Sequence, residues 1–305
     1  MPVVSQVLVE AQQLSRTFGK KTVLNQVNLT LHAGSITGFV GANGAGKTTA
    51  LCLMLGLIPG HGQTLFLGRP LAQWRAPASV VGAVFGGVAG HRRHSVRAHL
   101  QMVAAGVGEG DRRVEEMIDL IGMRDAARTP LAKLSLGMAQ RVGIAQAVIG
   151  RPKVLILDEP ANGLDPHSIH WLREFLRAQA DEGAAVLVSS HLLAEMQQFA
   201  DRVAVLSKGR IVSEGSMRDL LAYADSRSVI TVESPQLAEF TAIVNSHGGH
   251  LQANEDGTGR ITGMNRRKVG HLAADHSIVL YQLAEATISL EDFYLTIAEE
   301  EHKIS

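Results

Sequence analysis

Apolar and polar positions alternate along the first part of the chain, as they do in β-strands with one buried face. Residues 7–11 and 23–31 follow this alternation on either side of a turn at Gly19, Lys20 and Lys21. A two-residue period places successive side chains on opposite faces of a strand, and glycine favours the turn between two strands. The pattern therefore predicts an antiparallel β flap at the start of the domain.

Four later runs are largely apolar at consecutive positions: residues 36–40, 154–157, 185–188 and 203–206. Such runs are typical of parallel strands that are covered on both faces. Glycine-rich breaks and longer helical patterns separate them between residues 35 and 213. This order predicts an α/β fold in which βαβ units surround a largely parallel sheet.

Helical spacing dominates between residues 100 and 123, with turn signals at residues 106–110. A second helical pattern opens at Ser135 and stays apolar through Ile149. We therefore expect a helical insertion over about residues 95–150, placed between the strands of the parallel sheet.

The pattern changes after about residue 226, where short strands and helices alternate. The predicted order is strand 229–233, helix 236–246, a hairpin turning at Asp256 and Gly257, helix 266–276, strand 278–283 and a capped helix over 289–297. This is the order of a split βαβ, ferredoxin-like module. We expect two domains, residues 1–225 and a small α+β domain at residues 226–305.

The charge balance and cysteine content of the chain limit the kinds of molecule and compartment it is suited to. The 29 basic residues balance the 29 acidic ones, so no net field holds the chain on nucleic acid or anionic lipid. The single cysteine, Cys52, excludes an internal disulfide and fits a reducing cytoplasm. Residues 1–4 lack the start of a signal peptide, and the longest apolar stretches fall short of the roughly 20 residues that span a membrane. We expect a soluble chain, for which any action at a membrane would require a separate membrane-spanning partner.

A phosphate-binding loop follows the predicted strand 36–40. The pattern G-x-x-x-x-G-K-[ST] is met here, and a helical run follows it. Its glycines let backbone N–H groups converge on phosphates, its lysine reaches the outer phosphates, and its hydroxyl ligates Mg²⁺. The expected cofactors are ATP and Mg²⁺. The predicted nucleotide-binding residues are Gly41, Ala42, Asn43, Gly44, Ala45, Gly46, Lys47, Thr48 and the adjoining Thr49.

Two carboxylates end the buried run 154–157. Open α/β sheets bind ligands at the carboxyl ends of their strands, where Asp158 and Glu159 stand. We expect Asp158 to join Thr48 as a magnesium ligand. Glu159 can polarise the water that attacks the γ-phosphate, because the cation offsets the repulsion between neighbouring acids.

A serine and a glycine, Ser135 and Gly137, open the second helix of the insertion. By itself the segment predicts an N-capped core helix. At this point the chain resembles the ATP-binding subunits of ABC transporters, whose signature begins Leu-Ser. The resemblance places Ser135 and Gly137 at the anion-binding positions of that signature, with Leu136 and Met138 in place of its commonest glycine and glutamine.

Further motifs follow in the order of that family. Residues 161–165 resemble its D-loop and identify Asp165, while His191 resembles its switch histidine, which implies sensing of the γ-phosphate and orientation of the water. Phe18 stands near the place of the aromatic residue that stacks on adenine, although a flap-core phenylalanine explains it as well. Gly86 occupies the place of the Q-loop glutamine, so we assign no ligand there.

The resemblance implies a P-loop NTPase core of the ABC ATPase type and ATP hydrolysis coupled to transport. Residues 289–293 and 162–166 are similar to the bacterial drug and bacitracin exporter branch, which implies export of drugs, antibiotic peptides or other hydrophobic compounds. One P-loop and one signature imply a second copy of the chain, or a paralogous ATPase subunit, to complete each site. A separate integral-membrane permease would hold the protein at the cytoplasmic face of the cell membrane.

A run of basic and histidine residues follows the Q-loop position, where members of this family meet their permease. It contains His91, Arg92, Arg93, His94, Arg97 and His99. We expect these side chains to surround the pocket that takes the permease's cytoplasmic helix. An ordinary solvated face explains the same charges.

Other functions stay open at this stage. A non-transport ABC ATPase acting on ribosomes or DNA usually has two cassettes or long coiled coils, and the balanced charge here argues against nucleic acid. An ATP-gated regulatory or resistance factor, in which residues 226–305 are the working part, fits the same motifs. A small-molecule P-loop kinase leaves residues 134–141 and His191 unexplained.

Overall fold

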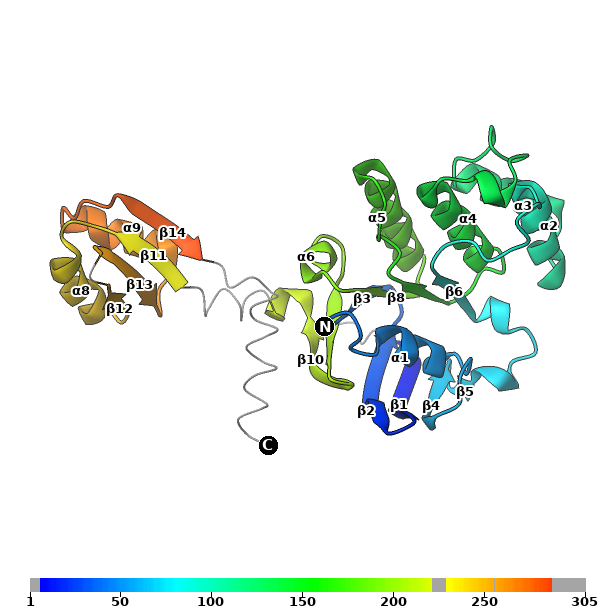
Figure 1. Ribbon diagram of the computed structural model, residues 1–305, viewed down its shortest axis with the longest axis horizontal. Helices are drawn as coiled ribbons and strands as arrows, with labels where there is room; N and C mark the ends of the chain where they lie inside the picture. Colours follow the sequence, from blue (N-terminus) through cyan, green and yellow to red (C-terminus); the bar gives the residue numbers. More distant parts are fainter. Residues whose placement is uncertain (1–5, 221–228, 255, 287–305) are drawn as a thin grey trace. The chain divides into compact units, whose positions relative to one another are not determined.

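The computed structural model describes residues 6–220, 229–254 and 256–286 (Figure 1). The chain forms two compact units, Met1–Gly215 and Ser216–Ser305. The boundary expected between residues 225 and 226 lies outside the described residues.

A six-stranded sheet forms the centre of the first unit, in the order β10-β9-β3-β8-β7-β6 among the described residues. The pairs β3–β8, β3–β9, β7–β8 and β6–β7 are parallel. Residues 185–190 are buried throughout, as a strand covered on both faces requires. The predicted central strands are thus confirmed. Their bounds are β3 (Ser35–Val40), β6 (Val81–Phe85), β7 (Val154–Asp158), β8 (Ala185–Ser190), β9 (Arg202–Ser207) and β10 (Arg210–Ser216).

The predicted flap is an antiparallel sheet in the order β2-β1-β4-β5. Its strands are β1 (Val7–Phe18), β2 (Lys21–His32), β4 (His61–Phe66) and β5 (Arg69–Pro70). The helix α1 (Lys47–Met54) lies beside this sheet, below the parallel sheet in the view of Figure 1. Leu24, Leu51 and Phe66 are fully buried in the core that joins the two sheets, so flap and nucleotide core share one hydrophobic interior.

Helices cover the other face of the parallel sheet, where α4 and α5 stand above it in Figure 1. The expected helical insertion is present as α2, α3 and α4, and side chains cap two of these helices. Ser95 accepts a hydrogen bond from the N–H of Ala98 at the start of α2, and Ser135 accepts one from Met138 at the start of α4. The helices are α2 (Val96–Gly106), α3 (Asp111–Leu120), α4 (Leu136–Val148), α5 (Pro166–Asp181) and α6 (Leu193–Met196), with short 3₁₀ turns at Leu71–Gln73, Pro77–Ser79 and Leu131–Lys133.

The second unit has the predicted ferredoxin-like order of elements and its own core. Among its described residues the sheet runs β12-β13-β11-β14 with antiparallel neighbours. Phe240 and Val244 of α8 are fully buried beside Ile230 and Val232 of β11. The elements are β11 (Val229–Glu233), α8 (Leu237–Ser246), β12 (His250–Ala253), β13 (Thr258–Thr262), α9 (Arg266–Asp275) and β14 (Gln282–Ala286).

The strand predicted over residues 278–283 was wrong in position, because β14 begins only at Gln282. Ser277 adopts a left-handed conformation (φ 56°), and the N–H of Ile278 still bonds to the carbonyl of Ala273 in α9. The apolar side chain of Ile278 packs into the core of the second unit without belonging to a strand. The N–H of Val279 bonds to the side chain of Gln236 instead of a neighbouring strand. The closing helix predicted over residues 289–297 lies outside the described residues.

Candidate nucleotide-binding and hydrolysis site

The predicted phosphate-binding loop connects the end of β3 to the start of α1. Gly44 and Gly46 adopt left-handed conformations (φ 80° and 110°), which only glycine takes without strain. A Cβ atom at Gly41 would lie 2.5 Å from the carbonyl oxygen of Leu206, so this position also requires glycine. The loop therefore folds tightly enough for successive backbone N–H groups to face a phosphate at a helix N-terminus.

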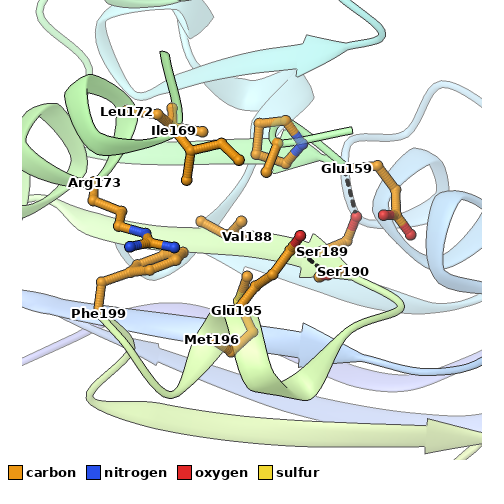
Figure 2. A pocket seen from close by; sticks show the side chains of 12 residues that line it. Glu159, Ile169, Leu172, Arg173, Val188, Ser189, Ser190, Glu195, Met196 and Phe199 are labelled. Atoms are coloured by element: carbon orange, nitrogen blue, oxygen red, sulfur yellow. Dashed lines mark hydrogen bonds between the residues drawn. The ribbon is translucent and has the colours of Figure 1, made fainter. Parts of the chain in front are cut away.

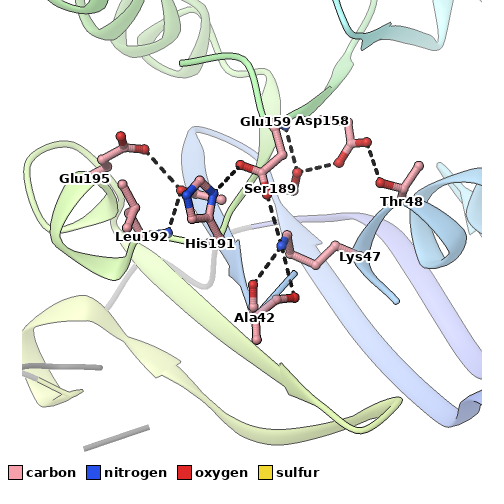
Figure 3. Close-up of polar contacts among 11 residues, drawn as sticks. Ala42, Lys47, Thr48, Asp158, Glu159, Ser189, His191, Leu192 and Glu195 are labelled. Carbon is pink, nitrogen blue, oxygen red and sulfur yellow. Dashed lines mark hydrogen bonds and ion pairs between the residues drawn. The ribbon is translucent and has the colours of Figure 1, made fainter. Parts of the chain in front are cut away.

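Lys47 is almost completely buried, with 6% of its surface exposed. Its Nζ donates hydrogen bonds to the carbonyl oxygens of Gly41 (2.7 Å) and Ala42 (3.4 Å). The same atom lies 3.0 Å from the carboxylate of Glu159 (Figure 3). The ammonium group thus connects the phosphate loop directly to the end of β7.

Thr48 and Asp158 form a second connection between the same elements. The Thr48 hydroxyl donates a 2.7 Å hydrogen bond to Oδ2 of Asp158 (Figure 3). A hydroxyl and a carboxylate oxygen are hard ligands of the kind that Mg²⁺ takes together with substrate phosphates. Among the described residues no cluster of three or more His, Cys, Asp or Glu side chains could hold a metal ion. The oxygens present therefore fit a metal that arrives with a nucleotide better than a metal held by the protein alone.

Glu159 follows Asp158 in a left-handed conformation, with φ 47°. This conformation costs about 1–2 kcal/mol for a residue other than glycine. Burial raises the pKa of Glu159, but the hydrogen bonds and charges of His191 and Lys47 outweigh it and hold the pKa below its ordinary value of 4.5. The carboxylate is therefore ionised at neutral pH, which is the form that a general base requires.

His191 lies on the loop after β8, and its Nδ1 is 2.9 Å from the Glu159 carboxylate. Glu159 thus lies between Lys47 on one side and His191 on the other (Figure 3). The structure brings five predicted residues, Lys47, Thr48, Asp158, Glu159 and His191, to one edge of the parallel sheet.

Sequence reasoning missed the two serines that end β8. Ser189 donates to Asp158 and accepts the backbone N–H of Glu159, while Ser190 accepts the N–H of Leu192 and donates to Glu195. The available signal was a polar pair at the carboxyl end of an apolar run. Serine is too common at strand ends for that signal to identify a site by itself.

A small cavity lies behind Glu159, between β8, α5 and α6 (Figure 2). Ile169, Leu172, Val188 and Phe199 contribute to its lining, and its volume is about 10 Å³. That volume holds one water at most. The cavity is therefore the packed back wall of the site and has no room for a nucleotide.

The predicted signature residues make their contacts at the start of α4. Ser135 caps this helix, Leu136 is 55% exposed, and a Cβ atom at Gly137 would lie 3.1 Å from the hydroxyl of Ser168 in α5. Asp165 caps α5 by accepting the N–H of Ser168 at 2.8 Å. The signature and the D-loop thus both adjoin Ser168 at the start of α5. The five residues at the sheet edge form a separate network of contacts.

Phe18 ends β1 and is 48% exposed. The guanidinium carbon of Arg16 lies 4.5 Å from the centroid of its ring. The ring thus has a cation on one face and keeps accessible surface for a second planar group.

Gly86 directly follows β6 in a left-handed conformation, with φ 69°. A side chain here would be strained by about 1–2 kcal/mol although space is open around it. The backbone conformation therefore explains a glycine at this position.

The basic and histidine run after Gly86 divides into a surface and a core part. His91, Arg92 and Arg93 are exposed. His99 is buried, with 1% of its surface exposed, and its Nε2 lies 2.8 Å from Oε1 of Gln146. The expectation that His99 joins an exposed pocket was wrong, because helical spacing turns it into the core of the insertion.

No helix among the described residues combines the length and apolar character needed to cross a bilayer. Residues 24–162 match the family model described as "ABC transporter". Residues 228–291 match a model described as a domain of unknown function, DUF8746.

Relatives resemble the chain over nearly its full length. An uncharacterized ABC transporter ATP-binding protein, YhcH of Bacillus subtilis (strain 168), is 33% identical over 298 residues, covering 96% of each chain. The bacitracin transport ATP-binding protein BcrA of Enterococcus faecalis is 30% identical over 303 residues, again covering 96% of each chain.

A solved structure of an ATP-binding subunit of an ABC transporter superposes with a TM-score of 0.65 and 28% identity, covering 71% of this chain and 92% of the other. The P-loop and the carboxylates at the end of β7 indicate the same family as the full-length relatives. The chain therefore belongs to the ABC transporter family as an ATP-binding, ATP-hydrolysing subunit.

Proposed function

We propose that this chain is the motor of an exporter, which hydrolyses MgATP to drive a separate integral-membrane permease. The observation that carries the proposal is the contact of Lys47 with Glu159 beside the Thr48–Asp158 pair, at the carboxyl edge of a parallel sheet. Export of drugs, antibiotic peptides or other hydrophobic compounds is supported by the bacitracin transport relative, which matches 96% of this chain.

In this proposal the backbone N–H groups of residues 41–48 and the Lys47 ammonium bind the phosphates. Thr48 and Asp158 hold Mg²⁺, which neutralises phosphate charge when bound. Glu159 accepts a proton from the attacking water, and His191 orients the Glu159 carboxylate through their 2.9 Å contact. Phe18 offers a ring face to the adenine.

A second ATPase subunit completes each site, either a copy of this chain or a paralogue. ABC ATP-binding subunits dimerise and work with membrane permeases. The predicted signature residues Ser135, Leu136, Gly137 and Met138 open α4. The positive N-terminal end of this helix, with the backbone N–H groups of Leu136 and Gly137, is offered to the γ-phosphate bound by the partner. ATP then stabilises the closed pair and hydrolysis releases it, which shifts the attached permease between its states.

Exposed Arg92 and Arg93 form the contact with the permease in this proposal. The permease holds the subunit at the cytoplasmic face of the cell membrane. The names of the full-length relatives describe transport proteins, so a non-transport ATPase is not favoured.

The test uses vesicles that contain the subunit together with the integral-membrane permease that co-purifies with it. Arg92→Glu with Arg93→Glu should keep ATP hydrolysis and lose transport. The matched control is Arg266→Glu with Arg267→Glu, which makes the same charge change at two exposed positions of α9 and should leave transport intact. Unchanged transport in the first variant would remove the permease contact from this surface. Failure of the subunit to co-purify with any permease would overturn the transport role.

A further inference from the structure

The hydroxyl of Ser189 contacts both proposed functional carboxylate residues. Ser189 lies next to last in β8, beside the end of β7, and no part of it is exposed. Its Oγ donates a 2.6 Å hydrogen bond to Oδ1 of Asp158 and accepts a 2.9 Å hydrogen bond from the backbone N–H of Glu159 (Figure 3). One hydroxyl has one proton and two lone pairs, so both bonds form together.

The two carboxylate oxygens of Asp158 accept hydrogen bonds from different residues. Oδ1 accepts from Ser189, while Oδ2 accepts from Thr48. Thr48 is a proposed magnesium ligand, so its bond to Asp158 is exchanged when the metal and nucleotide bind. The Ser189 bond does not involve the phosphate loop, so it can hold the orientation of Asp158 through that exchange.

The bond to Glu159 supports a disfavoured backbone conformation. Glu159 has φ 47°, and this left-handed turn directs its side chain to Lys47 and His191. A backbone N–H without a partner in such a turn would disfavour the conformation further. Ser189 is the acceptor that satisfies this N–H.

We propose that Ser189 is a positioning residue for ATP hydrolysis, whose single hydroxyl orients Asp158 for the metal and fixes the turn that aims Glu159. The proposal rests on the proposed roles of those two carboxylates. Ser189 therefore differs from a buried serine whose hydrogen bonds have only a structural role, because its two partners, Asp158 and Glu159, are both proposed to take part in hydrolysis.

The test compares variants of the full chain by phosphate release as Mg²⁺ is varied at a fixed, saturating concentration of ATP. Ser189→Ala should raise the Mg²⁺ concentration at half-maximal rate and lower kcat, each by about ten-fold or more, as expected for a lost hydrogen bond to a charged group. Binding of ATP without metal should change little. Ser189→Cys restores volume but bonds weakly, so it should resemble the alanine variant, whereas Ser189→Thr keeps the hydroxyl and should recover both values.

Thr37→Val is the matched control. Thr37 lies in β3 and is 1% exposed, and its substitution removes a buried hydroxyl from a neighbouring strand of the same sheet. This control should keep the wild-type Mg²⁺ requirement. If Ser189→Ala, checked as folded by its thermal unfolding, keeps the wild-type Mg²⁺ requirement and kcat, Ser189 has only a structural role and the proposal is overturned.

Asp158→Asn and Glu159→Gln separate this inference from the proposed function. Loss of turnover in both, with normal turnover in Ser189→Ala, would overturn the role of Ser189 alone. Normal turnover in both carboxylate variants would overturn the proposed function, and the role of Ser189 with it.

Discussion

Lys47 Nζ lies 3.0 Å from the carboxylate of Glu159, and the two side chains are 6% and 20% exposed. The ammonium group proposed to bind the phosphates therefore faces the carboxylate proposed to accept a proton from the water. Two residues 112 positions apart in sequence thus meet at one point, where charge neutralisation and proton transfer can be coupled.

The pKa of Glu159 predicts a pH dependence of stability. Because its pKa in the folded protein is below the ordinary 4.5, the unfolded chain binds more protons as pH falls through this range. The contribution to stability is therefore complete above pH 4.5 and is lost as pH falls below it. We expect the free energy of unfolding, measured in urea at pH 7 and pH 4, to fall more in the wild type than in Glu159→Gln. An equal loss of unfolding free energy between pH 7 and pH 4 in the wild type and in Glu159→Gln would contradict the ion pair.

One substitution can separate the role of Ser135 as the N-cap of α4 from its proposed contact with the γ-phosphate of the partner's ATP. Ser135→Asp keeps an N-cap, since aspartate caps helices as well as serine does, and stability should change by less than about 0.5 kcal/mol. The added negative charge should repel the γ-phosphate of the partner's ATP. In a Glu159→Gln background, light scattering should show loss of the ATP-dependent dimer. Ser95→Asp makes the same change at the N-cap of α2 and should leave the dimer intact. A dimer that survives Ser135→Asp would exclude the start of α4 from the interface.

Replacement of Phe18 tests the adenine contact. Phe18→Ala removes a stacking surface, so the Kd for ATP should rise by about two- to ten-fold. Phe18→Tyr keeps the ring and should bind normally. Leu57→Ala, at another large apolar side chain that is 63% exposed, controls for lost surface. An unchanged Kd in Phe18→Ala, measured by titration calorimetry, would assign Phe18 to the flap alone.

The separate core of the second unit predicts a local effect of mutation. Phe240 is fully buried in that core, so Phe240→Ala should destabilise the unit by about 3–5 kcal/mol. Hydrogen exchange should show lost protection in α8 and β11, while ATP binding by the first unit stays normal. Tyr281→Ala, at a residue 69% exposed, should change stability by about 0.5 kcal/mol or less. Loss of ATP binding in Phe240→Ala would show that the two cores are energetically coupled.

Sequence predicts those parts of the site that are contiguous in the chain. The phosphate loop carries its glycines and lysine within eight residues, and the two carboxylates directly follow an apolar run. The role of Ser189 depends instead on β8 pairing with β7, which is a tertiary relationship. Strand order is set by packing over long sequence separations and leaves no local pattern.

Two errors of prediction also have physical causes. His99 is expected at the permease pocket because it belongs to the basic and histidine run after the Q-loop position, but the helical period places it in the core. Residues 278–281 were assigned to a strand because they are apolar or aromatic. The positive φ of Ser277 and the hydrogen bond from the N–H of Val279 to the Gln236 side chain keep the start of this segment out of the sheet, and bonding to β11 begins only at the N–H of Tyr281.

Phosphate release and ATP binding measured together on Lys47→Ala and Glu159→Gln test the central claim most directly. Lys47→Ala should weaken ATP binding, because it removes the ammonium that faces the phosphates. Glu159→Gln should keep ATP binding and lower phosphate release by about a hundred-fold or more, as expected for loss of a general base. Wild-type phosphate release in Glu159→Gln, with ATP bound normally, would contradict the account.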